Sequence, residues 1–104
     1  MTRLIAPPQP QVYVQGSIRA GMVEYATGKV TAALAHAPRP VLFVRLSLTR
    51  AAARGVAAPF SVAVHVDVSG VDIYTSATAA TFTEAVDLAQ RRLHARLSRV
   101  DRWR

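Results

Sequence analysis

The sequence predicts an α+β fold, a two-layer sandwich in which a four-stranded sheet carries two helices on one face. Three observations support this fold. Several stretches alternate apolar and polar residues, as half-buried strands do. Two others repeat apolar residues every three or four positions, as amphipathic helices do. These stretches follow one another in the order β-α-β-β-β-α, within the 104 residues of one domain.

The first part of the chain predicts a strand followed by a helix. Residues 1–10 contain three prolines and no periodic pattern, so we expect a disordered leader there. Residues 11–15 alternate and predict a short strand. A helix then begins between residues 18 and 22, with Ser17 as a candidate N-cap, and ends before Pro38. Its apolar stripe consists of Val23, Ala26, Val30, Leu34 and Ala37.

The middle of the chain predicts three consecutive strands. Residues 41–50 alternate, and a longer connection at residues 51–59 leads to a second alternating stretch at residues 60–68. A turn at Ser69-Gly70 leads to the last strand, residues 71–77. These three strands pair antiparallel, whereas the helical crossover makes the first two strands of the chain a parallel pair. In the strand at residues 41–50, one face is expected to carry Leu42, Val44, Leu46 and Leu48.

The last third of the chain predicts a long helix. Thr81 or Thr83 is the expected N-cap, and the negative charge of Glu84 in the first turn complements the helix dipole. Apolar residues then recur at every third or fourth position and form a stripe along one face of the helix, which we expect to pack on the sheet. The residues of this stripe are Phe82, Val86, Ala89, Leu93, Leu97 and Val100.

Arginines lie beside the apolar stripe of this helix. Arg92, Arg96 and Arg99 fall within an arc of about 60° on a helical wheel. The acidic residues lie towards the ends of the helix, so like charges crowd its middle at a cost of a few tenths of a kcal/mol per pair. If the arginine side chains only covered the apolar edges of a solvated helix, we would expect acidic residues among them. The acids lie towards the ends instead, so the pattern favours a phosphate-bearing partner. Further round the helix and beyond it lie Arg91, Arg102 and Arg104.

The composition also favours a polyanionic partner. Thirteen Lys and Arg residues against six Asp and Glu give a net charge of +7, and twelve of the thirteen are Arg. The guanidinium group matches phosphate in a bidentate geometry. A GC-rich genome accounts for Arg in place of Lys but not for the excess over acids. The chain has no cysteine and no apolar run near the roughly 18 residues of a membrane span. We therefore expect a cytoplasmic protein.

Two further cations are candidates for contact with a polyanionic partner. Lys29 flanks the apolar stripe of the first helix, and Arg45 projects from the sheet face opposite the apolar row of its strand. If the helices pack side by side, Lys29 and the arginine row share one surface. Phe43 and Tyr74 are the only strand aromatics expected to point outward, too few for a base-stacking platform. Phosphate contacts to structured RNA are therefore favoured. The predicted RNA-binding residues are Lys29, Arg45, Arg91, Arg92, Arg96 and Arg99.

The sequence gives little support to catalysis. His36, His65 and His94 lie on three different elements, and none has a partner at metal-ligand spacing. His65 shares the outer sheet face with Asp67 and Asp72, which is a weak candidate for acid–base chemistry. Such residues more often keep a solvated face polar. We expect no enzymatic activity, no cofactor and no metal site.

Residues 62–99 carry a resemblance to a known family. Residues 73–87 correspond to a family pattern in which a strand ending near "ASAEG" leads into a helix that begins "D-[ML]-Y-x-A-I-D", and residues 24–29 correspond to "E-F-V-x-x-K". Positions that keep the pattern are Lys29, Phe82, Ala85, Val86, Asp87, Arg92, Leu93, Leu97 and Arg99. Positions that depart from it are Ala32, Ala79, Thr81 and Thr83. Over residues 11–100 the chain thus resembles the ribosome hibernation-promoting factors, also called ribosome-associated inhibitor or sigma-factor modulation proteins.

The resemblance implies a function. Proteins of this family bind the small ribosomal subunit in the channel for messenger and transfer RNA, and they silence idle ribosomes in stationary phase or stress. It implies a ribosome-binding domain over residues 11–104, either a short-form protein or the N-terminal domain of a longer one. Two alternatives stay open: a general double-stranded RNA-binding module, since the element order is close to that fold, and a protein-interaction domain that forms homodimers through its sheet.

Overall fold

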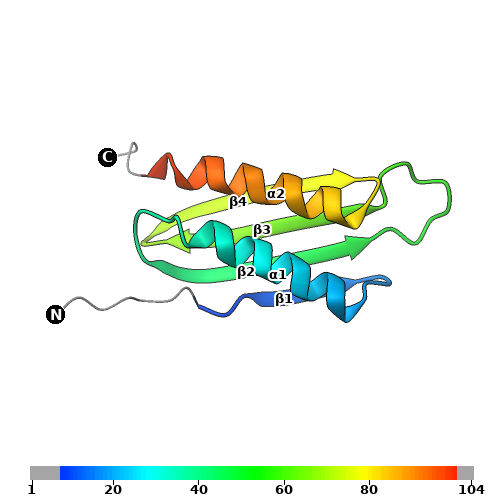
Figure 1. The fold of residues 1–104 in the computed structure, drawn as a ribbon, viewed down its shortest axis with the longest axis horizontal. Helices are drawn as coiled ribbons and strands as arrows, with labels where there is room; N and C mark the ends of the chain where they lie inside the picture. The colour runs from blue at the N-terminus through cyan, green and yellow to red at the C-terminus, as the bar shows by residue number, and fades with distance from the viewer. Residues whose placement is uncertain (1–7, 101–104) are drawn as a thin grey trace.

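The predicted element order is confirmed. The computed structural model describes residues 8–100, and Figure 1 shows one sheet with two helices lying across it. The α+β sandwich and the β-α-β-β-β-α order both match the expectation. Residues 1–7 of the predicted leader, together with Arg102 and Arg104, lie outside the described residues. The elements are β1 (Gln11–Gln15), α1 (Ala20–Leu34), β2 (Val41–Arg50), β3 (Phe60–Val68), β4 (Val71–Ala79) and α2 (Phe82–Leu97).

The strands lie in the order in which they occur in the chain. The sheet order is β1-β2-β3-β4, with β1 and β2 parallel and the other pairs antiparallel, as predicted. Both helices cover the same face of this sheet, so no described element covers its other face (Figure 1). Because the sheet begins with β1 and ends with β4, these two are its edge strands. Neither helix is long and apolar enough to cross a membrane.

The core lies between the helices and one face of the sheet. Alternation along β2 and β3 sends one apolar row of each strand inward. The ring of Phe82, at the start of α2, meets that of Phe60 edge-on with 5.9 Å between centroids. No charged or polar residue between positions 8 and 100 is fully buried. The largest fully buried side chains are Val30, Val44, Leu46, Leu48, Val62, Val64, Val66, Val68, Ile73, Val86, Leu93 and Leu97.

Two predictions about the first half of the chain are wrong. Ser17 does not cap α1, because the helix begins at Ala20 and its N-cap is Arg19, which makes no side-chain capping bond. Packing must therefore stabilise this end of α1. Leu42 is 60 % exposed, because the pairing of β2 with β3 shifts register between Val41 and Phe43 and takes Leu42 out of the inward row.

The second half of the chain follows its prediction closely. Thr81 is the N-cap of α2: its hydroxyl oxygen accepts a hydrogen bond from the Glu84 backbone N–H at 3.2 Å. The same hydroxyl donates to the Glu84 carboxylate at 2.9 Å. The last strand is two residues longer than predicted, because β4 continues pairing with β3 until Ala79 lies opposite Phe60.

A polar cluster ties the two helices together. The Tyr25 hydroxyl donates a hydrogen bond of 2.7 Å to Asp87 Oδ1, and Lys29 Nζ lies 3.6 Å from the same oxygen. The hydrogen bond to Asp87 raises the pKa of the Tyr25 phenol above its ordinary value, and desolvation and the negative charge of Asp87 act in the same direction. The folded protein thus holds the phenolic proton more tightly than the unfolded chain.

The hydrogen bond between Tyr25 and Asp87 predicts that the folded protein loses stability at alkaline pH. As the pH rises through about 10, Tyr25 of the unfolded chain loses its proton before Tyr25 of the folded protein, so unfolding becomes easier. Tyr25→Phe should remove the part of the alkaline loss of stability that comes from this phenol. Urea unfolding at neutral pH and above pH 10 should show a smaller alkaline loss for the Phe variant than for the wild-type chain. Tyr74→Phe is the matched control, and an equal loss in wild type and Tyr25→Phe would contradict the assignment.

The buried hydroxyl of Thr75 leads us to expect that replacing this residue with Val stabilises the protein. Its Oγ1 is buried, and no residue from 8 to 100 offers it a hydrogen bond. An unsatisfied buried hydroxyl costs about 1–3 kcal/mol, so Thr75→Val should raise the melting temperature by several degrees. Thr78→Val, an exposed site on the same strand, controls for the strand preference of Val. A lower melting temperature for Thr75→Val, with Thr78→Val unchanged, would show that the hydroxyl is satisfied.

Candidate nucleic-acid interface

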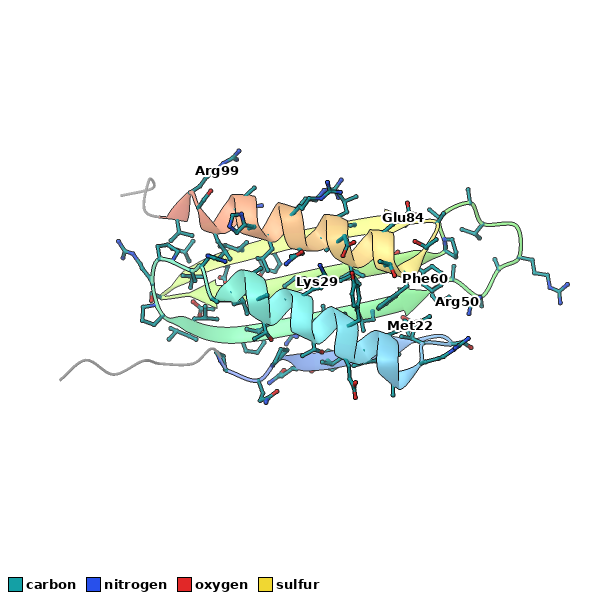
Figure 2. The ribbon with its side chains drawn as sticks, viewed as in Figure 1. Met22, Lys29, Arg50, Phe60, Glu84 and Arg99 are labelled. Carbon is teal, nitrogen blue, oxygen red and sulfur yellow. The ribbon has the colours of Figure 1, made fainter. Side chains whose placement is uncertain are left out.

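The outer surface of α2 and the turn after it carries four arginines. Arg91, Arg92 and Arg99 are exposed, and no carboxylate from residues 8–100 pairs with any of the three. The acids of the first two turns are already engaged, Glu84 in the N-cap and Asp87 with Tyr25 and Lys29. Figure 2 shows Arg99 at the opposite end of α2 from Glu84. Positive charge is therefore concentrated towards the C-terminal end of α2.

Arg92 and Arg96 reach from α2 to the edge of the sheet. Arg92 Nη1 donates to the carbonyl oxygen of Ser76 at 2.6 Å, and Arg96 Nη1 donates to the carbonyl oxygen of Tyr74 at 3.2 Å. β4 is an edge strand, and carbonyl groups along such an edge invite pairing with another chain. The two arginines satisfy these carbonyls and place charge over them. A guanidinium has five N–H donors, so Arg92 keeps others for a partner.

Arg91 lies on the other flank of α2. It lines a groove of about 300 Å³ between the helices, together with Gln90 and two histidines. His36 of the α1 end and His94 of α2 meet edge-on there, with 5.3 Å between ring centroids. Ala32 and Ala33 of α1 form the facing wall. The groove thus combines a guanidinium with two imidazoles, all of which can donate hydrogen bonds to an anion.

Lys29 and the arginine row only partly share a surface. The helices do pack side by side, and Lys29 lies on the α1 side that faces α2 (Figure 2). Arg92 and Arg96, however, turn away from α1 towards β4. The structure therefore groups Lys29 with the flank of α2 that holds Arg91, and its charge there is partly balanced by Asp87.

Arg45 lies on the uncovered face of the sheet, as expected. Its guanidinium lies 5.3 Å from the centre of the Phe43 ring and 5.6 Å from that of Tyr13. Tyr13 is 53 % exposed and was missed as an outward aromatic. The alternation of Val12 and Val14 around it was the signal for its direction. Arg45 thus belongs to a different surface from the arginines of α2.

The acid–base candidates on this face have structural roles. His65 Nε2 lies 2.9 Å from Asp72 Oδ1 across the hairpin. Asp67 accepts a hydrogen bond of 2.7 Å from the Gly70 backbone N–H and so closes the turn, in which Ser69 adopts a φ of 50°. Between residues 8 and 100 no group of three potential metal ligands is present.

The contacts of Arg92 and Arg96 predict a role against self-association. Replacing both with Ala should expose the β4 edge and promote pairing between copies. Sedimentation velocity over a range of concentrations should show more dimer for Arg92→Ala/Arg96→Ala than for the wild-type chain. Arg91→Ala/Arg99→Ala removes the same charge away from the edge and should stay close to wild type. Equal behaviour of the two variants would mean that net charge alone controls association.

Comparison with known proteins identifies the fold. No protein-family model and no curated protein matches the sequence. Among solved structures, a ribosomal subunit interface protein from Coxiella burnetii superposes with a TM-score of 0.67 at 18% identity, over 88% of this chain and 96% of that one. The N-terminal domain of Thermus thermophilus Protein Y gives 0.66 at 17% identity, over 85% and 93%. The resemblance drawn from the sequence is thereby confirmed as a likeness in fold to these two proteins.

Proposed function

We propose that this chain is a ribosome-binding factor that silences translation by occupying the messenger and transfer RNA channel of the small subunit. The observation that carries the proposal is that no carboxylate from residues 8–100 pairs with Arg91, Arg92 or Arg99, on a fold shared with a protein described as a ribosomal subunit interface protein. The factor is non-enzymatic, works in the cytoplasm in stationary phase or stress, and uses residues 11–104 as its ribosome-binding domain.

The α2 surface suits phosphate binding better than base recognition. Arginines bind backbone phosphates through charge and bidentate hydrogen bonds, which gives affinity and salt dependence with little sequence preference. Arg91 and Arg99 are exposed and are the principal candidates. Arg92 contributes the donors left over from its bond to Ser76, and Arg96 adds positive charge beside it. Lys29 contributes less, because Asp87 competes for its charge. Arg45 lies on the opposite face and cannot join this contact.

Binding to small ribosomal subunits tests the proposal. Co-sedimentation at low and moderate salt should show saturable binding that weakens steeply as salt rises. Arg91→Glu/Arg99→Glu should abolish most of this binding without disturbing the β4 edge. Arg19→Glu/Arg54→Glu carries the same change of charge outside α2, and this control should bind nearly as well as the wild-type chain.

The outcomes also separate the alternatives. An equal loss of subunit binding in both double variants would mean that net charge alone accounts for the effect. Unchanged binding of Arg91→Glu/Arg99→Glu would mean that the α2 surface does not contact the subunit. If plain duplex RNA competes as well as the subunit does, the chain is a general double-stranded RNA-binding module. If the protein stays in the supernatant at every salt concentration, the ribosome is not its partner.

A further inference from the structure

A continuous band of rings crosses the uncovered face of the sheet. Its members come from all four strands: Tyr13 from β1, Phe43 and Arg45 from β2, His65 from β3 and Tyr74 from β4. Arg45 lies over Tyr13 on one side and Phe43 on the other. The Phe43 ring meets His65 edge-on at 5.4 Å, and His65 stacks on Tyr74 at 4.1 Å with an interplanar angle of 11°. Each member thus contacts the next.

The two ends of this band are open. Tyr13 is 53 % exposed and Tyr74 is 61 % exposed, although both are large aromatic residues. The side chains are nevertheless held in place by their ring contacts. A fixed aromatic surface loses little conformational entropy when a ligand stacks on it. The band therefore has the properties of a binding surface.

A hollow lies directly beside the band. Ser47, Ala63 and Ser76 are register partners across β2, β3 and β4, so three small side chains form one row. Arg45, His65 and Tyr74 are likewise neighbours in the adjacent row and form a higher wall. The hollow between them has a volume of about 250 Å³. This is below the roughly 300–1,000 Å³ of pockets for larger small molecules and suits one flat ring system.

The charge on this face favours an anionic ligand. Asp72 is engaged by His65, and Asp67 is engaged by the Gly70 backbone N–H. No carboxylate from residues 8–100 lies within ion-pair distance of Arg45. The guanidinium, at the wall of the hollow, is thus left for an external negative group. A second copy of this face offers no free carboxylate to Arg45, which disfavours a homodimer as the occupant.

We propose that the uncovered sheet face is a second binding site, which takes unpaired bases of single-stranded RNA. One base lies in the hollow against the His65 and Tyr74 wall, where the hydroxyls of Ser47 and Ser76 meet its edges. Arg45 binds the adjoining phosphate. Rings with a nearby guanidinium are the usual means by which a sheet holds single strands. This site lies on the other side of the sheet from α2, and neither Arg91 nor Arg99 of the α2 surface lines it.

More rings lie on this face than the sequence predicted. Phe43 and Tyr74 alone were judged too few for a platform. The structure adds Tyr13 and His65: Arg45 links Tyr13 to Phe43, and direct ring contacts link Phe43 to His65 and His65 to Tyr74. The recognised group is a base with its phosphate, whether it belongs to a messenger or to an unpaired segment of ribosomal RNA.

Fluorescence anisotropy with labelled ten-nucleotide RNAs, oligo-U and oligo-A, tests this site. Both should bind the wild-type chain, and a duplex of the same length should not compete for the sheet face. Tyr74→Ala should weaken single-strand binding roughly 5- to 150-fold, the usual range for losing one stacked base. Arg45→Gln should reduce the slope of log K against log salt by about 0.7, the value for one phosphate contact to a single strand.

Two more variants keep the result interpretable. Ala63→Leu fills the hollow at an exposed strand position while leaving every ring of the band in place, and it should weaken binding as Tyr74→Ala does. Arg91→Glu/Arg99→Glu should keep oligonucleotide binding even where ribosome binding is lost, which separates the two surfaces. Thermal melts confirm that each variant is folded.

Three results would overturn the proposal. The first is no binding of either oligonucleotide by the folded wild-type chain. The second is single-strand binding that survives both Tyr74→Ala and Ala63→Leu. The third is self-association of the wild-type chain in sedimentation that these two variants abolish, because the face would then be occupied by a second copy.

Discussion

The structure depends on one constraint, the two-residue alternation of β2 from Phe43 onward, of β3 and of β4. Because the fully buried aliphatic side chains of these strands all point the same way, covering that face of the sheet buries far more apolar surface than covering the other. Both helices must therefore lie on that face. Their remaining sides become the charged exterior, and the opposite face stays open with a polar and aromatic surface. The two candidate surfaces are consequences of the same alternation.

The arginines of α2 show how structural and binding roles combine in one residue type. Arg92 and Arg96 satisfy backbone carbonyls of β4 through hydrogen bonds. A guanidinium has five N–H donors, so Arg92 keeps others for a partner. Lysine has a compact charge and cannot satisfy a carbonyl and present a planar fork at the same time. The preference for arginine in this chain therefore has a physical use on α2, whatever its origin in the genome.

The sequence predicted the element order, the inward rows and the capped start of α2, because periodicity and capping are local signals. It did not predict the exposure of Leu42, which results from a register shift between two strands. It placed Arg92 and Arg96 beside the apolar stripe but not on the β4 flank, since only the packing of α2 decides which strand they meet. The ring band was missed for the same reason: its members are 61 residues apart in the chain and adjacent only in the sheet, as the separation of Tyr13 and Tyr74 shows.

The position of β1 has a consequence for motion. This strand is five residues long and pairs only with β2, so it has the fewest interactions to lose when the sheet opens locally. It leads directly into Gly16, whose φ of +92° and contact with the Arg50 carbonyl leave no room for a side chain. Because Tyr13 lies on β1, any local opening of this strand removes one end of the ring band, and a ligand that bridges Tyr13 and Arg45 slows that opening. Occupancy of the open face and hydrogen exchange of the β1 amides are thus thermodynamically linked.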